Sequence, residues 1–344
     1  MDVALAKEII TKEIETVKID ERFEELEVDF MGGEPLLRFD LIKEVVEWME
    51  CNCDIPFVCF ASTNGTLLTN EMKEWFRNHH RTAYLGASYD GVAGEAQKIN
   101  RGTASIGVDL EFFNDVWPVQ GFKLTISKES LPYLYESLAD ASRKGYLIDA
   151  SLAHGINWNQ SDALLYREQL QKISEFYLSN PQYEPSNLLL RDLSAIGDKA
   201  EYQAKFCGSG TYMATYDVDG IMYGCHLFTP VVLGERALPH FEFKGWTDER
   251  ELTDPSCKGC ALQNWCSTCL GFNLLERGRV NLRDHRWCAM NAAQAISACE
   301  FQLEYFYRLT QLNDLKEREA RILQGAISAV EHLSRLDICS LFPQ

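Results

Sequence analysis

Seven of the 12 cysteines in this chain lie between positions 207 and 288, and their spacing constrains the fold more than any other feature. The order is Cys-x12-Gly-x4-Cys, then Cys-x2-Cys-x5-Cys-x2-Cys, then a last cysteine after 18 more residues. Thiolates are the ligands that iron–sulfur clusters require, and both sulfurs of a Cys-x2-Cys turn can reach one metal site. The start of the chain is acidic where an export signal would be basic, so clustered cysteines indicate metal rather than disulfides. The candidate ligands are Cys207, Cys225, Cys257, Cys260, Cys266, Cys269 and Cys288.

An iron–sulfur site is the first interpretation of this spacing, and a structural zinc site is the alternative. The four cysteines from 257 to 269 would suffice for one zinc ion, although seven cysteines do not divide into tetrads. Gly220 follows Asp-Val-Asp and predicts a hairpin turn that brings Cys207 and Cys225 together. The remaining cysteines are expected to be small core or surface residues: Cys51, Cys53, Cys59, Cys299 and Cys339.

Upstream of the cysteines, short β-like runs alternate with helical stretches. This alternation predicts βα units and a parallel sheet, as in a barrel or part of one. The expected strands are 26–31, 57–62, 83–88, 122–127 and 147–153. The expected helices are 2–18, 39–50, 69–79, one within 103–116, 130–144, 161–179 and an amphipathic stretch over 301–338.

Together these features resemble the radical S-adenosylmethionine (radical SAM) enzymes that carry a C-terminal SPASM domain. All seven cysteines and Gly220 match the SPASM pattern, except that two residues separate Cys266 from Cys269 where the family has three. The N-terminal half matches the barrel in Gly-Gly-Glu-Pro at 32–35, Ser-Thr-Asn-Gly at 62–65, Ser-Tyr-Asp-Gly at 88–91 and Asn-Arg at 100–101. The resemblance implies an α/β fold. It would comprise a partial parallel (β/α) barrel over 1–185, missing its first strand, a small SPASM module over 200–290 and a helical extension over 291–344.

The resemblance also assigns a site for S-adenosylmethionine. It implies that Gly32, Gly33 and Glu34 bind the amino group of that cofactor. It implies that Asn64, Ser88 and Asp90 make polar contacts around the ribose and carboxylate. Arg101 would pair with the carboxylate, for which a planar guanidinium is suited. All of these residues follow expected strands, at the end where α/β barrels bind ligands. Read without the resemblance, Asn64 and Asp90 could be ordinary turn residues, and the paired glycines an ordinary strand-to-helix turn.

The family's catalytic cluster is held by a Cys-x3-Cys-x2-Cys triad well before the paired glycines, and no cysteine precedes Gly32 here. The chain is therefore expected to be an N-terminally truncated form or, as the alternative, a degenerate relative. By itself it is expected not to cleave S-adenosylmethionine.

The resemblance implies two auxiliary [4Fe–4S] clusters. The second would be held by Cys257, Cys260, Cys266 and Cys288. The first would be held by Cys207, Cys225 and Cys269. Its fourth iron would be open to water, a substrate thiolate, or a side chain such as His226 or Asp217. Sulfatase-maturing relatives have an aspartate base at the position of His226. That histidine is a candidate general base and could equally be a structural hydrogen-bonding residue.

The expected function is radical-based maturation of a ribosomally made peptide or protein, by a thioether or carbon–carbon crosslink. The expected electron donor is an external protein such as flavodoxin or ferredoxin. The alternatives are a non-catalytic iron–sulfur protein for electron transfer or binding, and a zinc-stabilised α/β protein. A net charge of −18 disfavours nucleic acid as a partner, and no 18-residue apolar run predicts a membrane span. We expect a cytoplasmic protein. Its open barrel edge would favour self-association.

Overall fold

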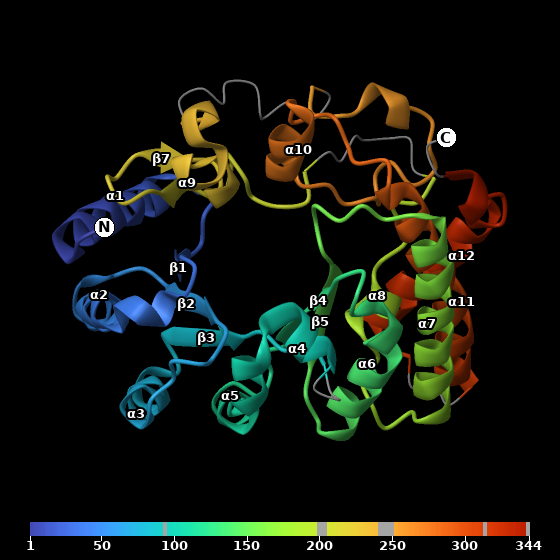
Figure 1. The fold of residues 1–344 in the computed structure, drawn as a ribbon, viewed down its shortest axis with the longest axis horizontal. Coiled ribbons are helices and arrows are strands. Elements are labelled where there is room, and N and C mark those ends of the chain that lie inside the picture. Colours follow the sequence, from blue (N-terminus) through green and yellow to red (C-terminus); the bar gives the residue numbers. More distant parts are fainter. Residues whose placement is uncertain (92–94, 198–204, 240–250, 312–314, 342–344) are drawn as a thin grey trace. The chain divides into compact units, whose positions relative to one another are not determined.

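The computed structural model describes residues 1–91, 95–197, 205–239, 251–311 and 315–341 (Figure 1). Its strands are β1 (Leu26–Phe30), β2 (Phe57–Thr63), β3 (Ala83–Ala87), β4 (Phe122–Ile126), β5 (Ile148–Leu152), β6 (Thr215–Tyr216) and β7 (Met222–Tyr223). Its helices are α1 (Val3–Ile19), α2 (Phe39–Asn52), α3 (Asn70–His79), α4 (Glu95–Arg101), α5 (Leu110–Val116), α6 (Leu134–Arg143), α7 (Gln160–Ser179), α8 (Asn187–Leu190), α9 (Pro230–Leu233), α10 (Leu270–Arg277), α11 (Trp287–Gln311) and α12 (Glu317–Leu333).

The chain divides into two compact units. The first contains residues 1–125, 140–149 and 217–220, and the second contains 126–139, 150–216 and 221–344. All the residues expected to bind S-adenosylmethionine lie in the first unit. All seven clustered cysteines lie in the second.

A parallel sheet in the order β1-β2-β3 forms the centre of the first unit. Alternate residues of β2 face opposite sides, so Cys59 and Ala61 are buried while Phe60 is partly exposed. The buried side packs in one hydrophobic core with residues of α2, α3 and α5, which Figure 1 shows beside the strands. A parallel bridge between Ser88 and Lys123 links the segment after β3 to β4. Among the described strands, β1 pairs with β2 alone, so it forms an edge of its sheet.

The five strands agree with the sequence-based prediction to within one residue at most ends. The helix expected within 103–116 is different, because the structure has α4 before it and a shorter α5 at its end. Gly102 follows α4 with a φ of 79°, which a continuing right-handed helix cannot adopt. Asp109 then starts α5 by accepting a hydrogen bond from the backbone N–H of Phe112.

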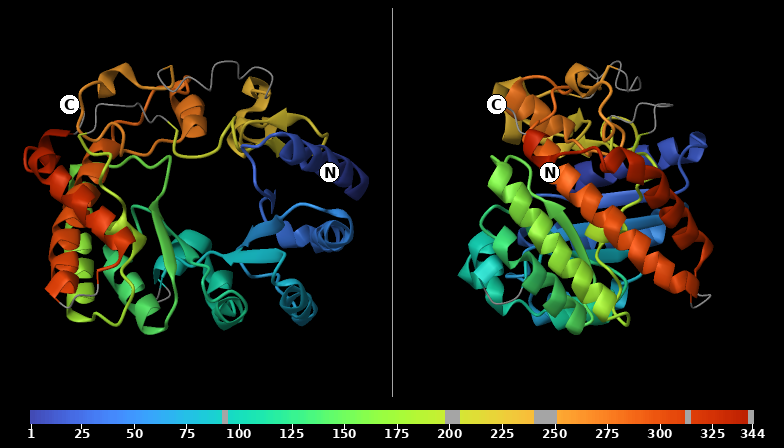
Figure 2. Two further views of the ribbon diagram at one scale, coloured as in Figure 1. Left: turned by 180° about the vertical axis from the view of Figure 1, so that it is seen from behind. Right: turned by 90° about the vertical axis from the view of Figure 1, so that its right-hand side faces the viewer.

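Long helices dominate the second unit, and Figure 2 shows α7, α11 and α12 side by side. Ala295 and Ala298 of α11 and Ala329 of α12 are fully buried in one core, where small side chains allow these two helices to pack closely. The single amphipathic stretch expected over 301–338 is instead the end of α11 followed by α12. Residues 312–314, between them, lie outside the described residues. The predicted hairpin is present, with antiparallel β6 and β7 joined by a turn in which Gly220 N–H donates to the carbonyl of Asp217.

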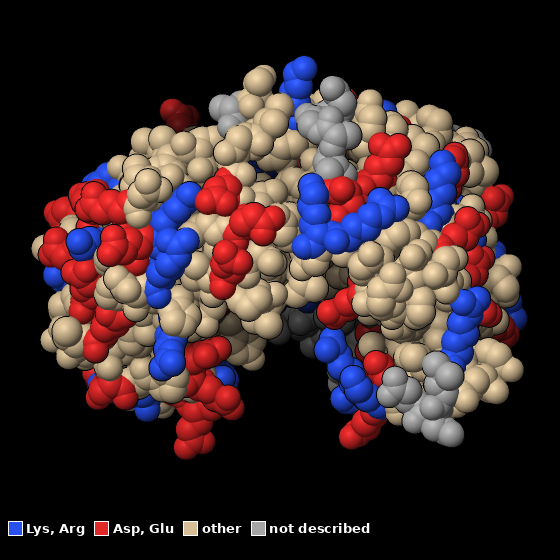
Figure 3. All heavy atoms as spheres, turned by 90° about the horizontal axis from the view of Figure 1, so that it is seen from below, with Lys and Arg blue, Asp and Glu red and all other residues tan. Residues whose placement is uncertain are grey.

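Charges of both signs are mixed on the face drawn in Figure 3. Among the described residues of that face, lysines and arginines alternate with aspartates and glutamates, without a broad basic area. No described helix is both long and apolar enough to cross a membrane.

Candidate functional site

Glu34 connects the carboxyl ends of two neighbouring strands. One of its carboxylate oxygens accepts a hydrogen bond from Thr63 Oγ1 at 2.7 Å, and the other accepts one from the backbone N–H of Asn64 at 2.9 Å. Glu34 follows β1, and Thr63 ends β2. Parallel neighbours place these two ends at the same edge of the sheet, so residues about 30 apart in sequence meet.

The paired glycines before Glu34 are exposed, in open space. A Cβ atom added to Gly32 or Gly33 would meet no heavy atom within 4 Å, and neither residue has a positive φ. Packing within the described chain therefore gives no reason for glycine at either position. A molecule approaching this edge from outside would have direct access to their backbone.

Asn64 forms an ordinary turn here. Its Oδ1 accepts hydrogen bonds from the backbone N–H of Thr66 at 2.9 Å and from the Thr66 hydroxyl at 2.7 Å. Ser88 lies at the bridge to β4, and its backbone N–H donates to the carbonyl of Thr63. Both residues are therefore at the same edge as Glu34, with the side chain of Asn64 engaged locally.

Asp90 and Arg101 bind each other. The Asp90 side chain has no exposed surface, and its Oδ2 lies 2.6 Å from Nε of Arg101. The other oxygen of Asp90 accepts a hydrogen bond from the backbone N–H of Thr125 at 2.7 Å. Arg101, whose side chain is 27% exposed, also reaches the Thr125 hydroxyl at 3.3 Å. The structure thus gives Arg101 a protein carboxylate as its partner and encloses Asp90.

In the second unit, three of the seven thiols influence one another. Burial raises the pKa of Cys225, and negative charge on Cys269 and Cys207 raises it further. Burial likewise raises the pKa of Cys269, to which charge on Cys207 contributes. These are the three cysteines that the resemblance assigns to the first cluster.

The other four thiols form a separate group. Burial raises the pKa of Cys288 to about 12, and charge on Cys266, Cys257 and Cys260 adds to this. Burial raises the pKa of Cys257 to about 11, again with a contribution from Cys266 and Cys260. Thiolates that repel one another in this way would be stabilised by binding a shared cation or cluster.

The donor chemistry of both groups fits thiolate-ligated iron–sulfur clusters. Among the described residues, no three or more His, Cys, Asp or Glu side chains are gathered as ligands of a single metal ion. In a cubane each thiolate binds a different iron, so its ligands lie further apart than those of one ion.

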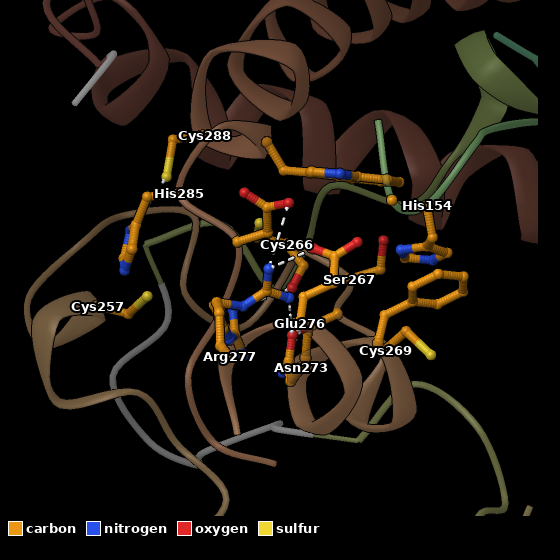
Figure 4. Close-up of a pocket in the computed structure, with 16 residues that line it drawn as sticks. His154, Cys257, Cys266, Ser267, Cys269, Asn273, Glu276, Arg277, His285 and Cys288 are labelled. Carbon is orange, nitrogen blue, oxygen red and sulfur yellow. Dashed lines mark hydrogen bonds and ion pairs between the residues drawn. The ribbon is translucent and has the colours of Figure 1, made fainter. Parts of the chain in front are cut away.

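A pocket connects the neighbourhoods of the two thiol groups. Figure 4 shows Cys257, Cys288 and His285 on one side of it, and Cys269 with His154 on the other. The His154 ring stacks between Phe272, at 5.2 Å, and Trp287, at 4.5 Å between ring centroids. Phe272 lies in the first turn of α10, just after Cys269, and Trp287 precedes Cys288, so this stack joins the helices next to both groups.

His226 is exposed beside the first thiol group. Its Nδ1 lies 3.6 Å from the sulfur of Cys225, the preceding residue. This position would allow it to act next to that group, either as a base or as a ligand.

Several residues of these sites were not expected from the sequence. Thr63 and Thr125 are partners of Glu34 and Asp90, and Arg283 and Arg191 lie next to the second thiol group. A position directly after a strand end could have pointed to Thr63. No local pattern distinguishes Arg283 or Arg191 from the other arginines, because their environment arises only from the packed structure.

Comparison with solved structures finds similar folds. A histidine-tagged form of anSMEcpe with bound AdoMet aligns with a TM-score of 0.61 over 88% of this chain and 85% of that chain, at 16% identity. Native anSMEcpe with bound AdoMet aligns with a TM-score of 0.59 over 89% of each chain, at 14% identity. Native anSMEcpe with bound AdoMet and Kp18Cys peptide aligns with a TM-score of 0.56 over 88% of this chain and 89% of that chain, at 14% identity. At these identities the likeness is one of fold. No protein-family model and no curated protein matches the sequence.

Proposed function

We propose that this chain is a radical SAM/SPASM protein that takes part in the maturation of a ribosomally made peptide or protein. Its fold is similar to that of anSMEcpe, which has been solved with AdoMet and with peptides. An external one-electron donor of the flavodoxin or ferredoxin kind would supply electrons. The bond formed would be a thioether or a carbon–carbon crosslink.

The grouping of the seven cysteines carries this proposal. The pKa of Cys225 is raised by charge on Cys207 and Cys269, and that of Cys288 by charge on Cys257, Cys260 and Cys266. These influences support the division into three and four thiols that the family resemblance implies. In this division the groups cross in sequence, because Cys269 would belong with Cys207 and Cys288 with Cys257. A simple zinc knot would use the four neighbouring cysteines from 257 to 269 instead.

Each thiol group would hold one cluster. Cys257, Cys260, Cys266 and Cys288 would ligate one cluster, and Cys207, Cys225 and Cys269 the other. Such clusters supply one-electron transfer when bound. Three cysteines leave one position of the first cluster for a further ligand, and a substrate thiol or His226 could take it.

The edge formed by β1, β2 and β3 would receive S-adenosylmethionine. Open space at Gly32 and Gly33 supports this part of the proposal, since backbone there can approach a ligand's amino group. The Asp90–Arg101 pair favours the second candidate function, a non-catalytic iron–sulfur protein, because the two residues satisfy each other. In that case the thiol groups would still bind clusters, and the strand edge would bind nothing.

Metal analysis tests the shared part of both candidates. Protein purified and reconstituted without oxygen is expected to contain about eight irons per chain, with matching acid-labile sulfide. About one zinc ion with little iron would overturn both candidates in favour of a structural zinc protein.

Cysteine variants then test the grouping. Cys225→Ala and Cys266→Ala are each expected to lower iron content and to remove a different electron paramagnetic resonance (EPR) signal. Cys51→Ala is the matched control, since Cys51 is exposed in the other unit and should change neither. Loss of the same signal in both cluster variants would contradict the proposed grouping.

Binding of S-adenosylmethionine, rather than its cleavage, separates the two candidates. Incubation with S-adenosylmethionine and dithionite, followed by a search for 5′-deoxyadenosine, is expected to give none from this 344-residue polypeptide, whose sequence has no Cys-x3-Cys-x2-Cys. Equilibrium binding of S-adenosylmethionine, weakened by Glu34→Gln, would favour the maturation protein. No binding at all would favour the non-catalytic candidate.

A further inference from the structure

A buried arginine lies against the second thiol group with part of its hydrogen-bonding capacity unused. Arg283 is 6% exposed. Its Nη1 donates to the backbone carbonyls of Gln263 and Cys266, each at 3.1 Å. Its Nε and Nη2 are buried and have no hydrogen-bond partner among the described residues. Buried guanidinium N–H groups without partners are costly, so their retention calls for an acceptor.

The surroundings of Arg283 identify the chemistry of that acceptor. It lines the pocket together with Cys257, Cys266 and Cys288. Burial raises the pKa of all three thiols, and the positive charge of Arg283 lowers it. Three thiols line this side of the pocket, so a sulfur-centred anion is the acceptor that these surroundings favour.

Arg283 has no carboxylate to neutralise it among the described ion pairs. The nearby Asp254 accepts from the backbone N–H of Arg283 at 2.8 Å, but its side chain faces Nε2 of His285 at 3.3 Å. Asp254 also adds negative charge next to Cys257, which acts against Arg283. The guanidinium charge of Arg283 therefore acts on the thiols, and Asp254 is the nearby carboxylate that counteracts it.

A second arginine contacts the adjacent peptide unit. Arg191 donates through Nη2 to the carbonyl of Trp265, directly before the carbonyl that Arg283 binds, and its guanidinium lies 4.0 Å from the Trp265 ring centroid. Its positive charge also acts on Cys266. Two guanidinium groups therefore act on the same cysteine.

We propose that Arg283, assisted by Arg191, neutralises charge at the second cluster and raises its one-electron reduction potential, with Nε and Nη2 of Arg283 donating to its sulfurs. This inference rests on the proposed function, because it requires a cluster on Cys257, Cys260, Cys266 and Cys288. Reduction takes a [4Fe–4S] cluster from the 2+ to the 1+ level. It consumes one electron from an external one-electron reductant, which is oxidised by one electron. No bond to a substrate and no proton is involved. Nearby positive charge and hydrogen bonds to sulfur favour the reduced, more negative level.

The test is a potentiometric titration of the reconstituted full chain, followed by EPR. Arg283→Gln removes the charge and keeps a polar side chain. It is expected to shift the reduction equilibrium of the second cluster about tenfold toward the oxidised form, or about 59 mV for a one-electron couple. Arg283→Lys keeps the charge and should shift it less. The signal of the first cluster should not move in either variant.

Arg279→Gln is the matched control, since Arg279 is an exposed arginine four residues away. An unchanged midpoint in Arg283→Gln, or an equal shift in Arg279→Gln, would overturn the inference. If Arg283→Gln binds no second cluster, Arg283→Lys decides. A second cluster that loads in Arg283→Lys with a potential lowered by less than about 59 mV supports the charge role. Failure of both variants to load shows that Arg283 only anchors the loop. Absence of iron from the unsubstituted protein would instead count against the proposed function itself.

Discussion

At the scale of single residues, the ion pair between Asp90 and Arg101 fixes the loop after β3. A fully enclosed carboxylate that loses its cation keeps an uncompensated charge, which costs several kcal/mol. We expect Arg101→Met to lower the free energy of unfolding by about 3 kcal/mol, measured by urea denaturation. Arg38→Met is the matched control, because it removes a pair with Asp40 that is exposed to solvent, and it should change the free energy of unfolding far less.

A double-mutant cycle separates the ion pair from general loss of packing. Asp90→Asn keeps an oxygen that can accept from Thr125 N–H but removes the charge. In that background, Arg101→Met should cost much less than it does alone. Equal costs in the two backgrounds would show that the pair contributes little, and that Arg101 is free to serve a ligand carboxylate.

The candidate sites were only partly predictable from sequence. The spacing of the cysteines pointed to metal ligands, and their division into two groups came from the family resemblance and stays a prediction. The position of Asp90 after a strand was also correct, but its enclosure by Arg101 was not predictable. That contact depends on how the segment 95–101 folds back on the strand ends. Arg283 could not be identified either, since burial of one arginine depends on the whole module.

At the scale of elements, α12 packs on the segment before residue 198 through a very close contact. Gly197 has a φ of 78°, and a Cβ added there would lie 2.2 Å from ring atoms of His332 in α12. We expect Gly197→Ala to destabilise the protein by about 3 kcal/mol, since it combines left-handed backbone strain with overpacking. Thermal or urea denaturation measures the effect.

Two further variants isolate the steric part of this effect. Gly145 has a similar φ of 74° but open space around its Cβ position, so Gly145→Ala should show the backbone strain alone, about 1–2 kcal/mol. In a His332→Ala background, Gly197→Ala should cost no more than Gly145→Ala. A cost that stays at about 3 kcal/mol without the ring would contradict the proposed contact.

The helices and strands were more predictable from sequence than the boundaries between successive helices. Strands β1 to β5 follow from short β-like runs, most of which end near Gly, Asn or Asp and precede helical stretches. The structure begins a separate helix, α12, at Glu317, and the sequence-based prediction missed this break. The pattern of apolar residues continues across this break, so periodicity alone predicted one stretch.

At the scale of the whole molecule, the division into two units predicts that cluster binding stabilises the second unit and not the first. The hydrophobic core of the first unit contains Trp75 and Trp117 and no clustered cysteine. In the second unit, strands β6 and β7 have two residues each, and α10 is the one α-helix described within 251–286. Cys225 packs against a small core that includes Tyr223 and Phe228, and Cys266 packs against the core of α11 and α12. Cluster binding would therefore supply part of the folding free energy of the second unit only.

Hydrogen–deuterium exchange with and without bound iron tests this directly. After removal of iron by a chelator, peptides from 205–239 and 251–288 are expected to exchange faster, because their opening free energy falls. Peptides from β1, β2 and β3 should keep their exchange rates, which makes them an internal control in the same sample. Reloading with iron and sulfide should restore protection of the cysteine segments. Equal loss of protection in both units would show that the first unit depends on the clusters, and no change in the cysteine segments would show that their fold does not need metal.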